Sequence, residues 1–259
     1  MKICFIVGHG KSSKGGYDSG AVCGNYHEFK IAKEIALHAY EYFNANYTDV
    51  AELMNYSGNM YLTDRIKQAN SKKYDFIAEI HLNAGGGTGS EVYYAKSSSN
   101  GKKVAAAISK SISSALGIKD RGAKTKIGSS GTDYFGIIRQ TNMEAVLIET
   151  AFIDTADLNK LKTAEGQKAC GIAIAKAVAT ALKAKNEPAP AITPKVNYFN
   201  KCNAKYTSIV DALKSLGFNS SFNYRKKIAT ANNIKLYVGT AKQNTQMLNL
   251  LKQGKLIKP

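Results

Sequence analysis

The sequence predicts an α/β fold with a mostly parallel, twisted sheet flanked by helices, followed by a small, mainly helical C-terminal domain. In the first part of the chain, short apolar runs alternate with helical patterns, which is typical of a parallel sheet. Three of the four prolines lie between Ala184 and Pro194, where they fix φ and remove backbone donors. We therefore expect one domain over residues 1–184, a linker over 185–197 and a second domain over 198–259.

The strands of the first domain are predicted from short runs of apolar and β-branched residues. These runs are Ile3–Val7, Asp75–Leu82, Ser90–Ala95 and Ala145–Thr150. The helices are predicted over Glu28–Phe43, Thr63–Ser71, Lys102–Leu116 and Asp157–Lys183. In the first helix, apolar residues such as Phe29, Ala32 and Ile35 recur with a period near 3.6. Because ligands of such folds bind at the carboxyl ends of the strands, functional side chains are expected at those ends.

The C-terminal part is predicted to form three short helices. They cover about Thr207–Leu216, Tyr224–Asn232 and Thr240–Gln253, and turn residues such as Gly217 and Gly254 end them. This part carries no catalytic constellation, and its Tyr, Phe and Lys content indicates a binding surface.

Composition and charge narrow the classes of function. With 44% hydrophobic and 21% charged residues the chain suits a packed core, and no apolar run reaches the ~18 residues of a membrane span. The net charge is +17, and the 73 residues from Glu187 onward hold 12 basic and 2 acidic residues. This excess indicates a polyanionic partner: nucleic acid, anionic lipid or an acidic cell-wall polymer. Lysines that only keep the surface soluble are the alternative.

The amino terminus and the cysteines bear on location. The first residues lack the long apolar stretch and cleavage site of a signal peptide, so we expect synthesis in the cytoplasm. The four cysteines form no C-x-x-C pair, which favours reduced thiols over a disulfide framework.

Two histidines stand at matching places. His9 follows the first strand between two glycines, and His81 lies near the end of the second. If the strands are parallel neighbours, both imidazoles emerge at one edge of the sheet, where they could bind zinc together with a third ligand. Glu28, which opens the first helix, and its neighbour His27 both qualify. Each residue also has a structural interpretation, since a strand-end histidine is often structural and an acid suits a helix N-terminus.

Acidic residues at strand ends are candidates for proton transfer. Glu149 ends a buried strand, where partial burial would raise its pKa and let it take a proton from water. A solvated or lysine-paired carboxylate is the alternative. Glu79 shares a strand face with His81 and could orient it. The glycine-rich stretch 83–89 could approach a substrate or form a loose loop, and 131–134 is a candidate substrate rim.

Taken together, these segments resemble a known family. Val7-Gly8-His9-Gly10, Glu28, Ile80–Ala84 and Val146–Glu149 occur in the order found in zinc-dependent N-acetylmuramoyl-L-alanine amidases of the amidase-3 family, with Arg121-Gly-Ala-Lys124 between the last two. The resemblance covers about residues 1–183. It implies that His9, Glu28 and His81 bind Zn²⁺ and that Glu149 is the catalytic glutamate.

Two departures from the family pattern resemble the clostridial phage endolysin branch. Ile6-Val7-Gly8 replaces Asp-Pro-Gly before His9, and Thr-Ala-Phe follows Glu149 where a glycine-phenylalanine pair is usual. The tail, over about residues 198–258, is similar to the C-terminal wall-binding modules of Gram-positive phage endolysins and wall amidases.

The resemblance implies a peptidoglycan hydrolase that cleaves the amide between N-acetylmuramic acid and L-alanine. The implied partners are peptidoglycan and anionic Gram-positive wall polymers, with no nucleic acid and no membrane insertion, and the implied place of action is the wall after release from the cytoplasm. A zinc peptidase acting within the stem peptide, a host autolysin with the same activity, and a non-catalytic wall-binding or nucleic-acid-binding protein are the alternatives. The sequence does not predict an oligomeric state.

Overall fold

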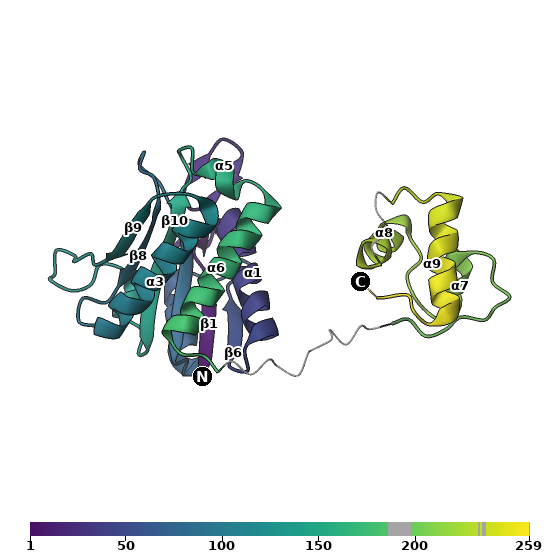
Figure 1. Cartoon of the computed structure of the whole chain (residues 1–259), viewed down its shortest axis with the longest axis horizontal. Helices are drawn as coiled ribbons and strands as arrows, with labels where there is room; N and C mark the ends of the chain where they lie inside the picture. Colours follow the sequence, from purple (N-terminus) through teal and green to yellow (C-terminus); the bar gives the residue numbers. More distant parts are fainter. Residues whose placement is uncertain (186–197, 233, 235–236, 259) are drawn as a thin grey trace. The chain divides into compact units, whose positions relative to one another are not determined.

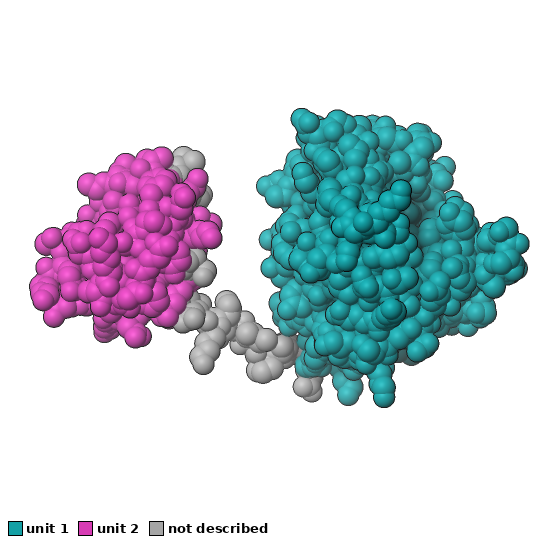
Figure 2. Space-filling model, turned by 180° about the vertical axis from the view of Figure 1, so that it is seen from behind, with its two compact units in different colours: residues 1–191 teal, residues 192–259 magenta. Residues whose placement is uncertain are grey.

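The chain forms two compact units in a computed structural model that describes residues 1–185, 198–232, 234 and 237–258. The units are Met1–Ala191 and Ile192–Pro259 (Figures 1 and 2). Apart from Lys185, the predicted linker lies outside the described residues. Among the residues that are described, no helix is long and apolar enough to cross a membrane.

The first unit is built on a six-stranded sheet with the strand order β6-β1-β7-β10-β8-β9. Its strands are β1 (Lys2–Val7), β6 (Val50–Met54), β7 (Phe76–Asn83), β8 (Ser90–Tyr94), β9 (Asp120–Lys124) and β10 (Glu144–Phe152). β1 pairs in parallel with β6 and β7, and β10 pairs in parallel with β7. β8 is antiparallel to β10 but parallel to β9. The prediction of a mostly parallel sheet is therefore confirmed.

Helices cover both faces of this sheet, and alternate residues of β1 show the division. Ile3, Phe5 and Val7 face a core made with α1 (Glu28–Asn46), α3 (Ser99–Leu116) and α6 (Ala164–Ala181), the helices in front of the sheet in Figure 1. Cys4 and Ile6 face a smaller core on the other side, made with α2 (Leu62–Lys72) and α4 (Gly136–Arg139). The strands are thus buried on both faces, as parallel sheets usually are.

The single helical stretch predicted over Asp157–Lys183 is wrong in one respect, because the structure divides it. α5 (Leu158–Leu161) ends before Thr163, whose side chain accepts a hydrogen bond from the Gly166 N–H and starts α6. A threonine in this position satisfies a backbone donor that the first turn of the helix leaves free.

Two small hairpins follow β1 and carry the chain to α1. β2 (Gly10–Lys11) pairs with β3 (Tyr17–Asp18), and β4 (Val22–Cys23) pairs with β5 (Tyr26–His27). They bring the start of α1 back to the carboxyl end of β1.

The second unit contains the three predicted helices: α7 (Ile209–Ser215), α8 (Phe222–Ala231) and α9 (Ala241–Gln253). Side chains of Ser208, Ser221 and Thr240 cap their first turns. Its separate core is formed by buried residues that include Phe199, Leu213, Ile228, Met247 and Leu251. The expected helical C-terminal region is present, although α8 begins two residues earlier than predicted.

Candidate metal centre and active site

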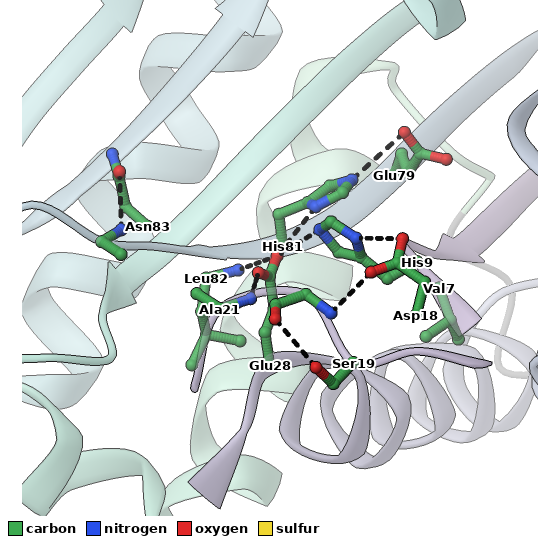
Figure 3. Close-up of polar contacts among 12 residues, drawn as sticks. Val7, His9, Asp18, Ser19, Ala21, Glu28, Glu79, His81, Leu82 and Asn83 are labelled. Carbon is green, nitrogen blue, oxygen red and sulfur yellow. Dashed lines mark hydrogen bonds and ion pairs between the residues drawn. The ribbon is translucent and has the colours of Figure 1, made fainter. Parts of the chain in front are cut away.

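His9, Glu28 and His81 converge at the carboxyl ends of β1 and β7. One possible ligand atom from each lies within 4.8 Å of the others (Figure 3). Glu28 Oε1 is 3.2 Å from His9 Nε2 and 2.9 Å from His81 Nδ1. His27, the alternative third ligand in the sequence, does not join this group, and its Nδ1 is buried without a hydrogen-bond partner among the described residues.

The Glu28 carboxylate is fixed by backbone donors as well as by the histidines. Oε1 accepts a hydrogen bond of 3.0 Å from the Leu82 N–H, and Oε2 accepts one of 2.8 Å from the Ala21 N–H. Burial raises the pKa of Glu28, but the hydrogen bonds with His81 and His9 outweigh burial and hold this pKa well below its usual range. Glu28 is therefore an ionised carboxylate with a single orientation.

Each imidazole meets a second carboxylate at its other nitrogen. His9 Nδ1 is 2.9 Å from Asp18 Oδ2 on β3, and His81 Nε2 is 3.2 Å from Glu79 Oε2 on β7 (Figure 3). Burial lowers the pKa of both histidines, and the neighbouring carboxylates raise it to a net value above the usual one. Two imidazoles that each lie between carboxylates need either a second proton or a metal ion.

This donor set fits a divalent metal. Metal-binding histidines usually donate their free ring N–H to a carboxylate, which fixes the ring and its tautomer. Here His9 Nε2 and His81 Nδ1 face the shared Glu28 oxygen, while Asp18 and Glu79 stand at the outer nitrogens. Two imidazoles and one carboxylate are a common ligand set for zinc in catalytic sites.

Glycines make room for these side chains. A Cβ atom on Gly8 would lie 2.7 Å from His81 Nδ1 and closer still to two other ring atoms. A Cβ atom on Gly20 would lie 2.5 Å from Glu28 Oε2 and 2.7 Å from His9 Cδ2. Both glycines therefore serve the close approach of the imidazoles and the carboxylate.

The backbone of His9 is held in an unusual conformation. Its φ is +60°, in the left-handed region that few residues other than glycine adopt. The Asn55 Nδ2 amide donates hydrogen bonds of 2.8 Å to the carbonyls of both Val7 and His9. Asn55 thereby stabilises the backbone conformation in which His9 Nε2 faces Glu28 Oε1.

Glu149 stands beside this group. On β10 it is the register partner of His81 on β7 and of Glu91 on β8. Its Oε2 is buried and has no hydrogen-bond partner among the described residues. Burial, the main cause, raises its pKa to about 7, and the nearby carboxylates of Glu28 and Glu91 add to this effect. Such a group can accept and release a proton near neutral pH.

These residues line a cleft with a volume of about 430 Å³. Its walls include Lys11, Tyr61, Asn83, Phe135 and Ile137 in addition to the polar residues above. Of the predicted rim at 131–134, residues 131–133 line a different cavity of about 700 Å³, whereas the neighbouring Phe135 and Gly136 line the cleft.

The glycine-rich stretch 83–89 is held in place by hydrogen bonds to two aspartates. Asp154 accepts hydrogen bonds from the Gly85 and Gly86 N–H groups, and Asp157 accepts one from Gly89. The residues that begin it, Asn83 and Ala84, line the cleft. Of the two interpretations of this stretch, these contacts favour a close approach to a substrate over a loose loop.

The sequence pattern predicted no role for three polar residues of the site: Asp18, Asn55 and Arg65. Asp18 and Asn55 reach His9 from a short hairpin and from the turn after β6, where no periodic pattern marks them. Arg65 lies on α2 and forms a buried ion pair with Glu79. The sequence signal for Arg65 was a charged residue in an amphipathic helix, and this pattern is too common to single out one residue.

Comparison with known proteins identifies the family. The sequence profile described as N-acetylmuramoyl-L-alanine amidase matches residues 3–180, and the chain belongs to this family. A sporulation-specific N-acetylmuramoyl-L-alanine amidase from Bacillus subtilis (strain 168) is 35% identical over 167 residues, which are 63% of this chain and 61% of that protein. An endolysin from Bacillus phage SPP1 is 38% identical over 152 residues, 55% of this chain and 53% of that one.

Solved structures agree. Cwp6 from Clostridium difficile has a TM-score of 0.64 and 32% sequence identity over 70% of this chain and 29% of that one. The chain therefore spans only part of the relatives that it matches.

Proposed function

We propose that the first unit is a zinc-dependent amidase that hydrolyses the bond between N-acetylmuramic acid and the L-alanine of the stem peptide. One observation carries this proposal: three ligand-type side chains converge beside a buried carboxylate that has an oxygen without a partner. Membership of the amidase family and the names of the relatives support the choice of substrate.

In this proposal His9 Nε2, Glu28 Oε1 and His81 Nδ1 hold the zinc ion. When bound, zinc supplies Lewis-acid activation of the scissile carbonyl and of water. Asp18 and Glu79 each accept the outer N–H of one histidine and so keep the inner nitrogens unprotonated and directed at Glu28.

Glu149 is proposed as the group that moves the proton. Its Oε2 accepts a proton from the attacking water and then delivers it to the nitrogen of the departing L-alanine. Burial raises the pKa of Glu149 above its usual value, and a carboxyl group with a raised pKa can both take up and release a proton near neutral pH.

The Glu149→Ala variant tests this role. We expect the rate of wall hydrolysis to fall on the order of 10²-fold or more, while zinc content measured by elemental analysis stays at the wild-type value. Glu144→Gln, at the start of the same strand, is the matched control and should retain activity. Unchanged turnover in Glu149→Ala would remove the proposed role.

Product analysis of digested peptidoglycan tests the bond. New amino-terminal alanine supports the amidase. Other new amino termini would favour a peptidase that acts within the stem peptide, and new reducing ends on the sugar would contradict both.

We further propose that residues 1–184 form the catalytic domain, 185–197 a linker and 198–259 a cell-wall-binding domain of the clostridial endolysin type. In its described part, residues 198–258 without 233, 235 and 236, the second unit carries ten basic side chains and one acidic residue, Asp211. This charge suits the anionic polymers of a Gram-positive wall. The protein would act there after release from the cytoplasm.

Neighbouring lysines on exposed helix surfaces allow a direct test in the full chain. Replacing Lys226 and Lys227 of α8 with glutamine should weaken sedimentation with purified walls, and the effect should shrink as salt screens the charge. The same change at Lys102 and Lys103 of α3 is the control and should have no effect. Equal losses in both pairs would contradict a wall-binding role for the second unit.

A further inference from the structure

Arg65 and Glu79 form an ion pair that is almost entirely buried beside the histidines. Arg65 on α2 is 5% exposed and Glu79 on β7 is 1% exposed, and Arg65 Nε lies 2.7 Å from Glu79 Oε1. Replacing a buried ion pair with apolar residues of similar size is often neutral or stabilising, because desolvation of the two charges is costly. Stability of the fold therefore gives no sufficient reason for this pair.

The contacts of the pair point to the two histidines. The second oxygen of Glu79, Oε2, is 3.2 Å from His81 Nε2. On the other side, the Arg65 NH1 group donates hydrogen bonds of 3.1 Å to the His9 carbonyl and 3.0 Å to the Met60 carbonyl. One guanidinium thus reaches His9 through its backbone and His81 through the carboxylate of Glu79.

The Arg65 guanidinium acts on the backbone of His9, and the Glu79 carboxylate acts on the ring of His81. The His9 carbonyl belongs to a residue whose φ is +60°, so a hydrogen bond to it helps to maintain a conformation that is otherwise unfavourable. At the other end, an ionised Glu79 can only accept a hydrogen bond, so it selects the form of His81 that carries its proton on Nε2. The planar guanidinium suits this task because its donors have fixed relative directions.

We infer that Arg65 and Glu79 are positioning residues that brace His9 and His81 against each other and so set the zinc affinity of the centre. The inference rests on the proposed zinc site. Both residues line the cleft, and the role inferred for them is to act through the two histidines.

A double variant separates positioning from stability. In Arg65→Met/Glu79→Leu, both charges are replaced by apolar groups, so no unpaired charge remains buried. The carbonyls of His9 and Met60 lose their donor, so we expect the metal-free chain to fold but to melt a few degrees below the wild type. Zinc affinity, measured in the full chain by competition with a chromophoric chelator at fixed pH and ionic strength, should fall about 10- to 100-fold.

A matched control uses another arginine that caps two backbone carbonyls. Arg139 donates to the carbonyls of Asp133 and Tyr134 but forms no ion pair with a carboxylate in the described part of the chain and touches neither histidine. Arg139→Met should leave zinc affinity unchanged.

A spectroscopic measurement reports the hydrogen bond between His81 and Glu79 directly. ¹⁵N correlation spectra of the imidazoles in the zinc-loaded chain should show a His81 Nε2–H that is hydrogen-bonded to a carboxylate in the wild type, and its proton and nitrogen shifts should move toward those of a weakly bonded N–H in the double variant. A residue that serves only the fold would not change the hydrogen bond of this N–H in a chain that still folds and binds zinc.

If the double variant does not fold, Arg65→Lys takes its place, because it keeps the positive charge that pairs with Glu79. A lysine ammonium is a single point donor on a flexible stem, so it retains the pairing with Glu79 without the fixed geometry that reaches His9. We expect zinc affinity to fall severalfold in this variant, by less than in the double variant.

The outcomes distinguish the two levels of the proposal. If the wild-type chain binds no zinc, the proposed function fails and the inference fails with it. If the wild type binds zinc and a folded double variant, or Arg65→Lys in its place, binds it equally well, only the positioning role of Arg65 and Glu79 is overturned.

Discussion

Gly8→Ala adds one methyl group to the centre without replacing a proposed ligand. Gly8 follows β1, its N–H donates to the Ile80 carbonyl at 3.0 Å, and its φ lies outside the left-handed region, so the backbone accepts alanine. The new Cβ would lie 2.7 Å from His81 Nδ1, with Nε2 and Cε1 closer still. Because carbon atoms normally approach to about 3.5–4.0 Å, the imidazole of His81 has to move by about 1 Å.

Such a displacement exceeds what a metal site accepts. Ligand distances are held within about 0.2 Å of their usual values, and a misplacement of 1 Å can cost about 10²-fold in rate. We therefore expect Gly8→Ala to lose bound zinc by elemental analysis and to hydrolyse walls about 10²-fold more slowly. Gly16→Ala is the control, since its Cβ would have Ser12 Oγ at 3.7 Å as its nearest neighbour. A fully zinc-loaded Gly8→Ala variant with wild-type turnover would refute the reasoning.

Two further predictions concern carboxylates around the centre. Asp18→Ala removes the acceptor of the His9 Nδ1–H, so chelator competition should report zinc binding about tenfold weaker or worse; equal affinity would contradict the role of Asp18. Burial raises the pKa of Glu91, but hydrogen bonds from Lys124 and Arg121 lower it to a net value below the usual one. A lowered folded-state pKa gives stability that is present above the unfolded value of ~4.3 and is lost as pH falls through the folded value. Urea denaturation should therefore show Glu91→Gln about 1.5 kcal/mol less stable than the wild type at pH 7, since Arg121 and Lys124 are partly exposed, with the difference narrowing below about pH 4; a constant difference would contradict this.

The parts of the fold that the sequence predicts well are those with strong apolar patterns. β1, β7 and β10 are central strands buried on both faces, so their sequences are nearly continuous apolar runs. The edge strands β6 and β9 were not predicted, and composition explains this only for β9, since four of the five residues of β6 (Val50–Met54) are apolar. Three of the five residues of β9, Asp120–Lys124, are charged, which protects an edge from pairing with another chain but hides the strand from a hydrophobicity argument.

The candidate site divides in the same way. The convergence of His9 and His81 could be predicted, because neighbouring parallel strands end at the same edge of a sheet. The choice of Glu28 over His27 could not be derived from the strand pattern alone, because it depends on the rotation of the first turn of α1. Arg65 could not be predicted at all, since its partner is chosen by how α2 packs on β7.

The carboxylates Asp18, Glu28, Glu79 and Glu149 of the centre differ in their pKa values, because only some of them have partners that offset burial. Asp18, Glu28 and Glu79 each have a cationic or hydrogen-bonding partner, and in each case the partner outweighs burial and lowers the pKa; for Glu79 the value is about 2. Glu149 has an oxygen without such a partner among the described residues, and burial raises its pKa to about 7. Pairs of groups whose surroundings move their pKa values apart take different roles in catalysis. The three partnered carboxylates therefore stay ionised and fix the positions of their neighbours, and Glu149 is the member of the four that can exchange a proton at neutral pH.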